Sequence, residues 1–238
     1  MTATASTGEV GRAREARAEE TLGERAASLI ERDILSGALA PGLRLGVHAL
    51  SGAYAIGTTP VREGLSRLVA RGIVTAVGQR GFRVADVSRA DLEDITRVRV
   101  LVETEALATS MARGGDAWEV GIVAALHRLR LCLERAPEGM AEGSEEFDRC
   151  HRQFHRALLA GCGSARLLAL HDDLYAQAYR YRRVMMNRLG APERFLQTHE
   201  ALAELVLARQ AEAAQEGLAR HLDQTLATVY GEGAEGAA

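Results

Sequence analysis

The sequence predicts a mainly α-helical protein, in which an N-terminal winged helix-turn-helix domain precedes an antiparallel bundle of six or seven helices. Two observations support this fold class. Of the 238 residues, 47% are hydrophobic but only 4% are aromatic, so the cores must consist largely of alanine, leucine and valine, a composition that favours helices. Apolar residues also recur with the helical period of about 3.6 residues along most of the chain.

Positive charge is concentrated in one segment. All 29 basic residues counted as lysine plus arginine are arginine. Six of them fall between Arg44 and Arg83, where Glu63 is the only acid, whereas the chain from Arg89 onward is acidic overall. The basic segment is therefore the part that we expect to contact a polyanion such as DNA.

Cysteine usage and hydropathy indicate the compartment. Cys132, Cys150 and Cys162 form no CxxC pair, so they suggest neither a disulfide framework nor a zinc ribbon. The chain has no apolar run near the length of about 20 residues that spans a bilayer, and it does not open with a signal peptide. We therefore expect a cytoplasmic protein, with disordered tails over residues 1–20 and 231–238.

Residues 21–87 follow the order of a winged helix-turn-helix domain. Apolar spacing predicts the helices, Pro41 and Gly42 predict a turn, and Gly78 and Gly81 bound a hairpin. The second helix of the helix-turn-helix pair is amphipathic with a basic face, as a helix that enters the major groove would be. The expected elements are a helix at 22–36, an edge strand at 43–45, helices at 47–54 and 58–71, and strands at 73–77 and 82–85.

DNA contacts are expected from the basic helix, from its neighbours and from the hairpin tip. Thr58 and Thr59 stand where a short polar side chain can cap the helix. Arg62, in the first turns of the helix, is the candidate for hydrogen bonding to the edge of a DNA base, while Arg67 would contact phosphate or pair with an acid. The remaining candidates are His48, Arg80 and Gly81. The alternative is a winged helix that binds only protein.

Residues 88–230 read as six helices separated by glycine and proline. Ser88 or Asp91 can cap the first, and Gly114 with Gly115 ends it. The expected helices cover 88–113, 118–135, 145–160, 165–189, 194–208 and 211–230.

Four histidines in this region form a candidate metal site. His151 and His155 are four residues apart, so they share a helix face and can bind one ion. His199 and His221 lie within the last two helices, and facing helices of a bundle commonly build such sites. We expect His48, His127 and His171 to take no part in this set and to be surface or structural residues.

Two resemblances add to this interpretation. The motifs ILSGALAPGLRL, TPVREGLSRLVARGIV and QRGFRV resemble, in order and spacing, the DNA-binding domain of the GntR family of bacterial regulators. The family usually has serine or threonine followed by arginine where this chain has Gly57 and Thr58, and often a basic residue where it has His48. This departure implies an operator that differs from the common family site, or a lower affinity.

The segments FDRCHRQFHRALLAGCGS and THEALAELVLARQAEAAQEGLARHL resemble the metal-binding effector domain of the FadR subfamily, of the all-helical FCD type. That resemblance implies a divalent ion held by an aspartate and three histidines, to which a carboxylate effector binds. His155, His199 and His221 match the three histidines, whereas His151 replaces the aspartate and Asp148 stands three residues before it. Four histidines favour zinc or nickel over hard ions.

Arg99 matches a pocket-facing arginine of the same family, and it can bind a carboxylate in bidentate fashion. The alternative is a surface ion pair with Glu103. Together these features predict a homodimeric, ligand-responsive transcriptional repressor that releases operator DNA when a small organic acid binds at the metal. Three alternatives stay open: a pure metal sensor, a metal-dependent enzyme, and a metal-free pocket that binds the anion directly.

Overall fold

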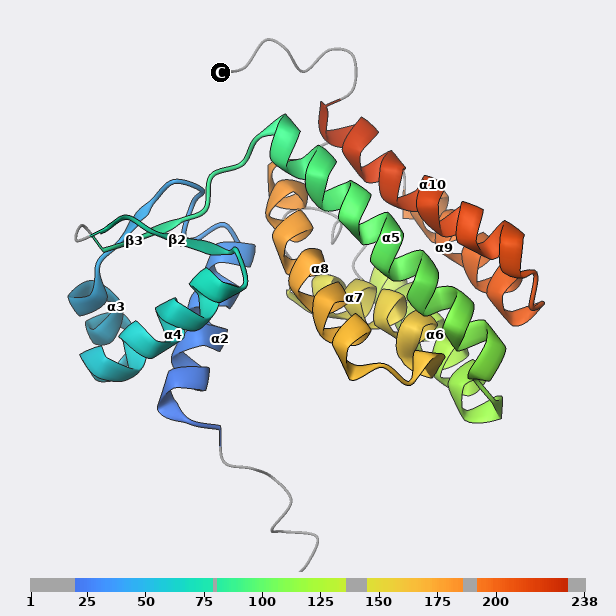
Figure 1. Cartoon of the computed structure of the whole chain (residues 1–238), viewed down its shortest axis with the longest axis horizontal. Helices are drawn as coiled ribbons and strands as arrows, with labels where there is room; N and C mark the ends of the chain where they lie inside the picture. The colour runs from blue at the N-terminus through green and yellow to red at the C-terminus, as the bar shows by residue number, and fades with distance from the viewer. Residues whose placement is uncertain (1–19, 79–80, 136–144, 186–191, 231–238) are drawn as a thin grey trace, which may run out of the picture.

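The computed structural model describes residues 20–78, 81–135, 145–185 and 192–230. It consists of an N-terminal winged helix-turn-helix domain beside a bundle of long helices, so the predicted fold class is confirmed (Figure 1). None of the helices in these ranges is long and apolar enough to cross a bilayer. The two expected tails, and Arg80 at the hairpin tip, lie outside the described residues.

The N-terminal domain contains helices α2, α3 and α4 and a three-stranded sheet. The elements are α2 (Leu22–Leu35), β1 (Arg44–Leu45), α3 (Val47–Tyr54), α4 (Thr58–Ala70), β2 (Val74–Ala76) and β3 (Phe82–Val84). The strands are antiparallel in the order β1-β3-β2, with Val74 opposite Val84 and Arg44 opposite Arg83. Gly81 has φ +97°, a conformation that a side chain would strain.

Helix α2 begins with a capping box and packs closely against α4. The Thr21 hydroxyl accepts from the amide of Glu24, whose carboxylate accepts from the amide of Thr21. At Gly64 of α4, an added Cβ would lie 2.7 Å from the backbone nitrogen of Ala27. A glycine is therefore required for the two helices to approach this closely.

The predicted cap of α4 is wrong. The N-cap residue is Gly57, which has no side chain, and Thr58 and Thr59 are the first two residues of the helix itself. The side chains of the two threonines therefore lie one and two positions too late to cap it. The first amide groups of α4 receive no side-chain cap, and they are left to a ligand or to water.

Helices α5 to α10 form the second domain (Figure 1). Ser88 caps α5 by accepting from the amide of Asp91, as one of the two expected capping residues. The core is largely aliphatic, with Trp118, Phe147 and Phe154 among its larger members. The helices are α5 (Arg89–Arg113), α6 (Asp116–Arg135), α7 (Glu145–Leu159), the short 3-10 helix η2 (Ala160–Cys162), α8 (Ala165–Met185), α9 (Pro192–Leu207) and α10 (Ala211–Tyr230).

Helix α8 of the bundle packs against α2 of the N-terminal domain (Figure 1). Ala176 is fully buried within the hydrophobic core of the N-terminal domain. One helix of the bundle thus contributes to the packing of the neighbouring domain.

Candidate functional site

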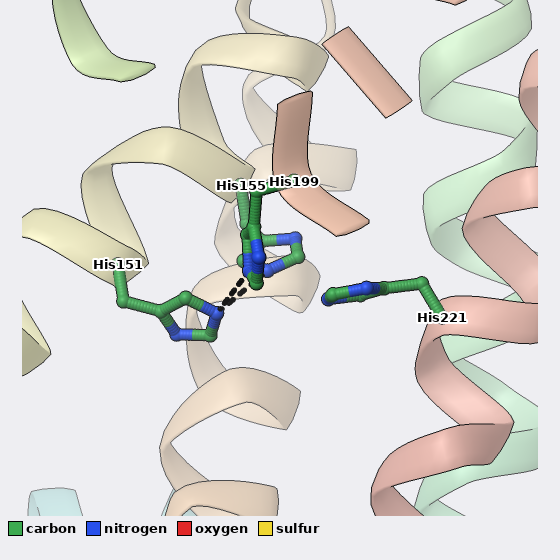
Figure 2. A group of neighbouring side chains, drawn as sticks. All are labelled: His151, His155, His199 and His221. Atoms are coloured by element: carbon green, nitrogen blue, oxygen red, sulfur yellow. Dashed lines mark hydrogen bonds between the residues drawn. The ribbon is translucent and has the colours of Figure 1, made fainter. Parts of the chain in front are cut away.

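The four histidines predicted as metal ligands lie together inside the bundle. His151 and His155 come from successive turns of α7, His199 from α9 and His221 from α10, and their rings point toward a common centre (Figure 2). One nitrogen from each lies within 4.8 Å of the others. The first three are buried, and His221 is half-buried.

The spacing of these nitrogens is compatible with one small cation. The Nε2 atom of His151 lies 2.9 Å from Nε2 of His199 and 3.0 Å from Nε2 of His155. Tetrahedral zinc with Zn–N bonds of about 2.0–2.1 Å holds its ligand nitrogens about 3.3 Å apart. Small side-chain shifts would therefore give the geometry of a bound ion, and the residues fit the group that the family resemblance implies.

Hydrogen bonds orient two of the rings for this role. Nδ1 of His199 lies 2.7 Å from the carbonyl oxygen of Phe195, which can only accept, so the neutral ring carries its proton on Nδ1 and leaves Nε2 bare. Nδ1 of His151 is hydrogen-bonded to the Tyr175 hydroxyl at 2.6 Å. In both residues the nitrogen facing the cluster is the one available to an ion.

Burial keeps the third ligand neutral. Desolvation, followed by the charges of His221 and His199, holds the pKa of His155 well below its usual value. Neutral imidazole is the form that ligates a metal.

Arg99 lines the same cavity as His151, His155 and His221, as expected for an effector-binding residue. It forms the alternative ion pair as well, because its Nε donates to Glu103 at 2.7 Å, but this pair is buried rather than on the surface. Glu103 engages only Nε, so the terminal nitrogens can bind a carboxylate while Glu103 holds the side chain in place.

Glu103 also contacts a histidine that the sequence did not assign to the site. Nδ1 of His171, which is fully buried, lies 3.3 Å from the same carboxylate oxygen. Burial alone would raise the pKa of Glu103, but Arg99 and His171 outweigh burial and lower it to about 2. The carboxylate is therefore ionised at neutral pH, and it fixes both neighbours. The expectation that His171 is structural agrees with this position, whereas His127 is exposed.

Tyr175 and Tyr179 are site residues that the sequence analysis missed. Both line the histidine cavity from α8. The sequence does contain a pattern that groups them: His171, Tyr175 and Tyr179 follow one another at intervals of four residues, so they share a helix face. Asp148, which stands three residues before His151, lines a cleft on the side of the bundle that faces α2.

The candidate DNA-contacting residues lie on α3, α4 and the hairpin. His48, Thr59, Arg62 and Arg67 are exposed, whereas Thr58 and Gly81 are half-buried. Arg67 lies 3.4 Å from Glu24 of α2, so the ion pair considered for this residue is formed. Arg62 makes no such contact among the described residues, and its guanidinium is accessible on the first turns of the basic helix.

Arg71, at the end of α4, joins the two domains. Its guanidinium pairs with Glu31 of α2, and its Nε lies 2.5 Å from Asp173 of α8. Gln177 of α8 donates to the Arg71 carbonyl oxygen at 2.8 Å. Further along α8, Arg180 donates to the carbonyl oxygen of Ala85 at 2.9 Å. The face of α8 opposite Tyr175 and Tyr179 thus forms hydrogen bonds and an ion pair with the N-terminal domain.

Known proteins resemble this chain in both halves. Residues 22–84 match the family of bacterial regulatory proteins called gntR, and residues 94–224 match the FCD domain. The transcriptional repressor GlaR of Escherichia coli K12 is 38% identical over 198 residues, which cover 81% of this chain and 89% of GlaR. The regulator BphR of Paraburkholderia xenovorans LB400 is 35% identical over 200 residues, which cover 84% of this chain and 82% of BphR.

The solved structure of McbR from E. coli is similar in fold. It superposes with a TM-score of 0.75 and 22% identity, covering 88% of this chain and 97% of McbR. The relatives are helix-turn-helix regulators of transcription and not enzymes, which removes the enzyme alternative.

Proposed function

This chain belongs to the GntR family of bacterial regulatory proteins and carries an FCD domain, and on that premise we propose that it is a repressor released from its operator by a small organic acid. The acid would bind beside a divalent ion in the bundle. The observation that supports the proposal most directly is the convergence of four imidazoles next to the buried guanidinium of Arg99. A repressor acts on the chromosome, so we place the protein in the cytoplasm.

The ion would be held by His151, His155, His199 and His221. An all-nitrogen ligand set favours zinc, with nickel as the second choice. The bound ion supplies a positive centre that attracts a carboxylate. Because His151 stands where the resembling family has an aspartate, the site carries one negative charge fewer and attracts an anion more strongly.

Arg99 would receive the carboxylate of the effector. It lines the same cavity as the histidines, and the ion pair between its Nε and Glu103 fixes the guanidinium. A charge-assisted, bidentate hydrogen bond of this kind also selects for carboxylate geometry. The head group of the effector would thus lie between a guanidinium and the ion.

The operator would be bound by two copies of the chain. A homodimer would present two α4 helices related by a twofold axis, and a palindromic DNA site has the same symmetry. Arg62 would reach a base edge from the first turns of α4, and Thr58, Thr59, Arg67 and His48 would contact the backbone. The hairpin with Arg80 and Gly81 would follow the minor groove.

Helix α8 would transmit the signal. Its tyrosine face lines the effector cavity, and its opposite face holds Arg71 and Ala85 of the DNA-binding domain. An effector that binds better in one position of α8 shifts the population toward that position, and it changes DNA affinity by linkage.

A pure metal sensor is the second candidate, and one feature favours it. Four protein ligands can complete the tetrahedral shell of zinc, as in closed sites that offer no position to a further ligand. In that case, the ion itself would be the signal. Five-coordination would leave room for the effector.

Fluorescence anisotropy with operator DNA separates these candidates. The operator would be selected from random-sequence duplexes by the wild-type protein, and a panel of small carboxylic acids added at a fixed zinc concentration. Release by an acid, weakened in Arg99→Ala at unchanged zinc content, supports the proposal. Release that follows zinc alone would identify a metal sensor.

A further inference from the structure

The histidine cavity is too small for an organic acid. It measures about 10 Å³, which is room for about one water-sized species. Ligand pockets typically measure about 300–1,000 Å³. An ion and the tip of a carboxylate fill this cavity, so the remainder of any effector must lie elsewhere.

A larger cavity adjoins it. A cleft of about 450 Å³ lies between the domains, lined by α2 on one side and by α7 and α8 on the other. Tyr175 and Tyr179 line both the cleft and the histidine cavity, so their side chains form the common wall. The two rings are stacked with centroids 6.0 Å apart. A ligand that displaced these rings would occupy both spaces.

The cleft offers a guanidinium at a short distance from the wall. The guanidinium carbon of Arg152 lies 6.0 Å from the ring centroid of Tyr175, whose hydroxyl bonds to His151. Arg152 and Arg156 both lie 3.6 Å from Asp172 and compete for its single charge. Arg156 can keep that ion pair, so Arg152 can turn to an anion in the cleft.

The other charges of the cleft do not oppose an anion there. Arg32 and Arg149 line it together with the acids Glu31 and Asp148. Glu31 pairs with the guanidinium of Arg71, which also pairs with Asp173. Arginines thus outnumber acids by three to two among the residues that line the cleft, and Leu35 of α2 supplies apolar surface.

We infer that the effector is an elongated acid with an anionic group at each end, which spans from the histidine cavity to Arg152 in the interdomain cleft. This inference rests on the proposed function, because one carboxylate binds at the ion and Arg99. The chain of the acid passes Tyr175 and Tyr179 and contacts Leu35. The effector itself then touches the DNA-binding domain, and α8 is not the sole connection between the two.

Titration calorimetry on the zinc-loaded, full-length protein tests this inference. The probes are unbranched dicarboxylates from malonate to suberate, each paired with the monocarboxylate of the same chain length. The variants are Arg152→Gln, Leu35→Trp, which fills the cleft from α2, and the control Arg166→Gln, which removes an exposed guanidinium of α8 that does not line the cleft. Zinc content and circular dichroism of each variant establish that the bundle is intact.

The wild type should bind one dicarboxylate length at least about tenfold more tightly than its paired monocarboxylate, the value of one charge-assisted contact. Arg152→Gln should abolish that preference, Leu35→Trp should weaken binding of the preferred dicarboxylate, and Arg166→Gln should retain the preference. Equal binding of both series, unaffected by Arg152→Gln and Leu35→Trp, would overturn the inference and confine the effector to the histidine cavity. Absence of binding by every acid to the zinc-loaded wild type would overturn the proposed function as well.

Discussion

Replacement of Glu103 by glutamine tests the buried charges that hold Arg99 at the cavity. Glu103 is fully buried between Arg99 and His171, and its pKa is about 2 against an ordinary value of 4.5. Each pKa unit corresponds to about 1.4 kcal/mol, so the ionised form stabilises the folded state by about 3 kcal/mol at pH 7. We expect Glu103→Gln to lose about this amount, because it also leaves Arg99 buried without its counter-charge.

The sign of the pH dependence follows from the lowered pKa. Since the folded state binds this proton less readily than the unfolded state, the stabilisation is complete above about pH 5 and is lost as the pH falls toward 2. The linkage relation leaves less of this stabilisation at pH 4 than at pH 7, and less again at pH 3. The difference between wild type and variant should therefore shrink as the solution becomes acidic.

Urea unfolding followed by circular dichroism at pH 7 and pH 4 measures this difference. Glu105→Gln is the matched control, because Glu105 lies on the same helix and is exposed. The control should stay within about 0.5 kcal/mol of the wild type at both pH values. A Glu103→Gln variant as stable as the control at pH 7, or a difference that grows at pH 4, would refute the electrostatic reasoning.

Three further substitutions test other parts of the structure. Arg62→Ala should weaken operator binding, measured by anisotropy, at least about tenfold without changing the mass measured by light scattering. The control Arg220→Ala, on distant α10, should bind the operator as the wild type does. Equal affinities of the two variants would show that Arg62 makes no base contact. Asp173→Asn should speed amide hydrogen exchange where α8 meets α4 by about fivefold to tenfold, because a charge-assisted hydrogen bond to Arg71 is lost. Unchanged exchange there would show that this ion pair does not hold the domains together. Gly64→Ala should destabilise the protein by about 1–3 kcal/mol in thermal unfolding, because the added Cβ would press on Ala27. The control Gly121→Ala, with open space around the added Cβ, should leave the stability unchanged. Similar melting temperatures of the two variants would contradict the close approach of α2 and α4.

The helices could be predicted from the sequence because their signals are local. The predicted helix over residues 211–230 matches α10; β2 is one residue shorter than predicted at each end, and β3 is one residue shorter at its C-terminal end. The cluster of histidines could be predicted for a similar reason, since the spacing of His151 and His155 places both on one helix face. Helical period and glycine positions involve only neighbours in sequence.

The features that the sequence did not reveal depend on distant contacts. Arg71 pairs with Asp173, which lies 102 positions further along the chain, and nothing near Arg71 in the sequence distinguishes it from Arg67. The burial of the ion pair between Arg99 and Glu103 likewise depends on α8, which supplies His171. The cap of α4 was misassigned because several small polar residues follow Gly57, and only backbone geometry shows where the helix begins.

The metal content of untagged protein, measured by elemental mass spectrometry, tests the central claim most directly. Wild type, His155→Ala and the control His127→Ala, which alters an exposed histidine, would be purified alike. We expect about one zinc or nickel ion per chain in the wild type and in the control, and loss of the ion in His155→Ala. An absence of metal from all three proteins after resupply with zinc and nickel would contradict the account, and it would leave Arg99 and the histidines to bind the effector without an ion.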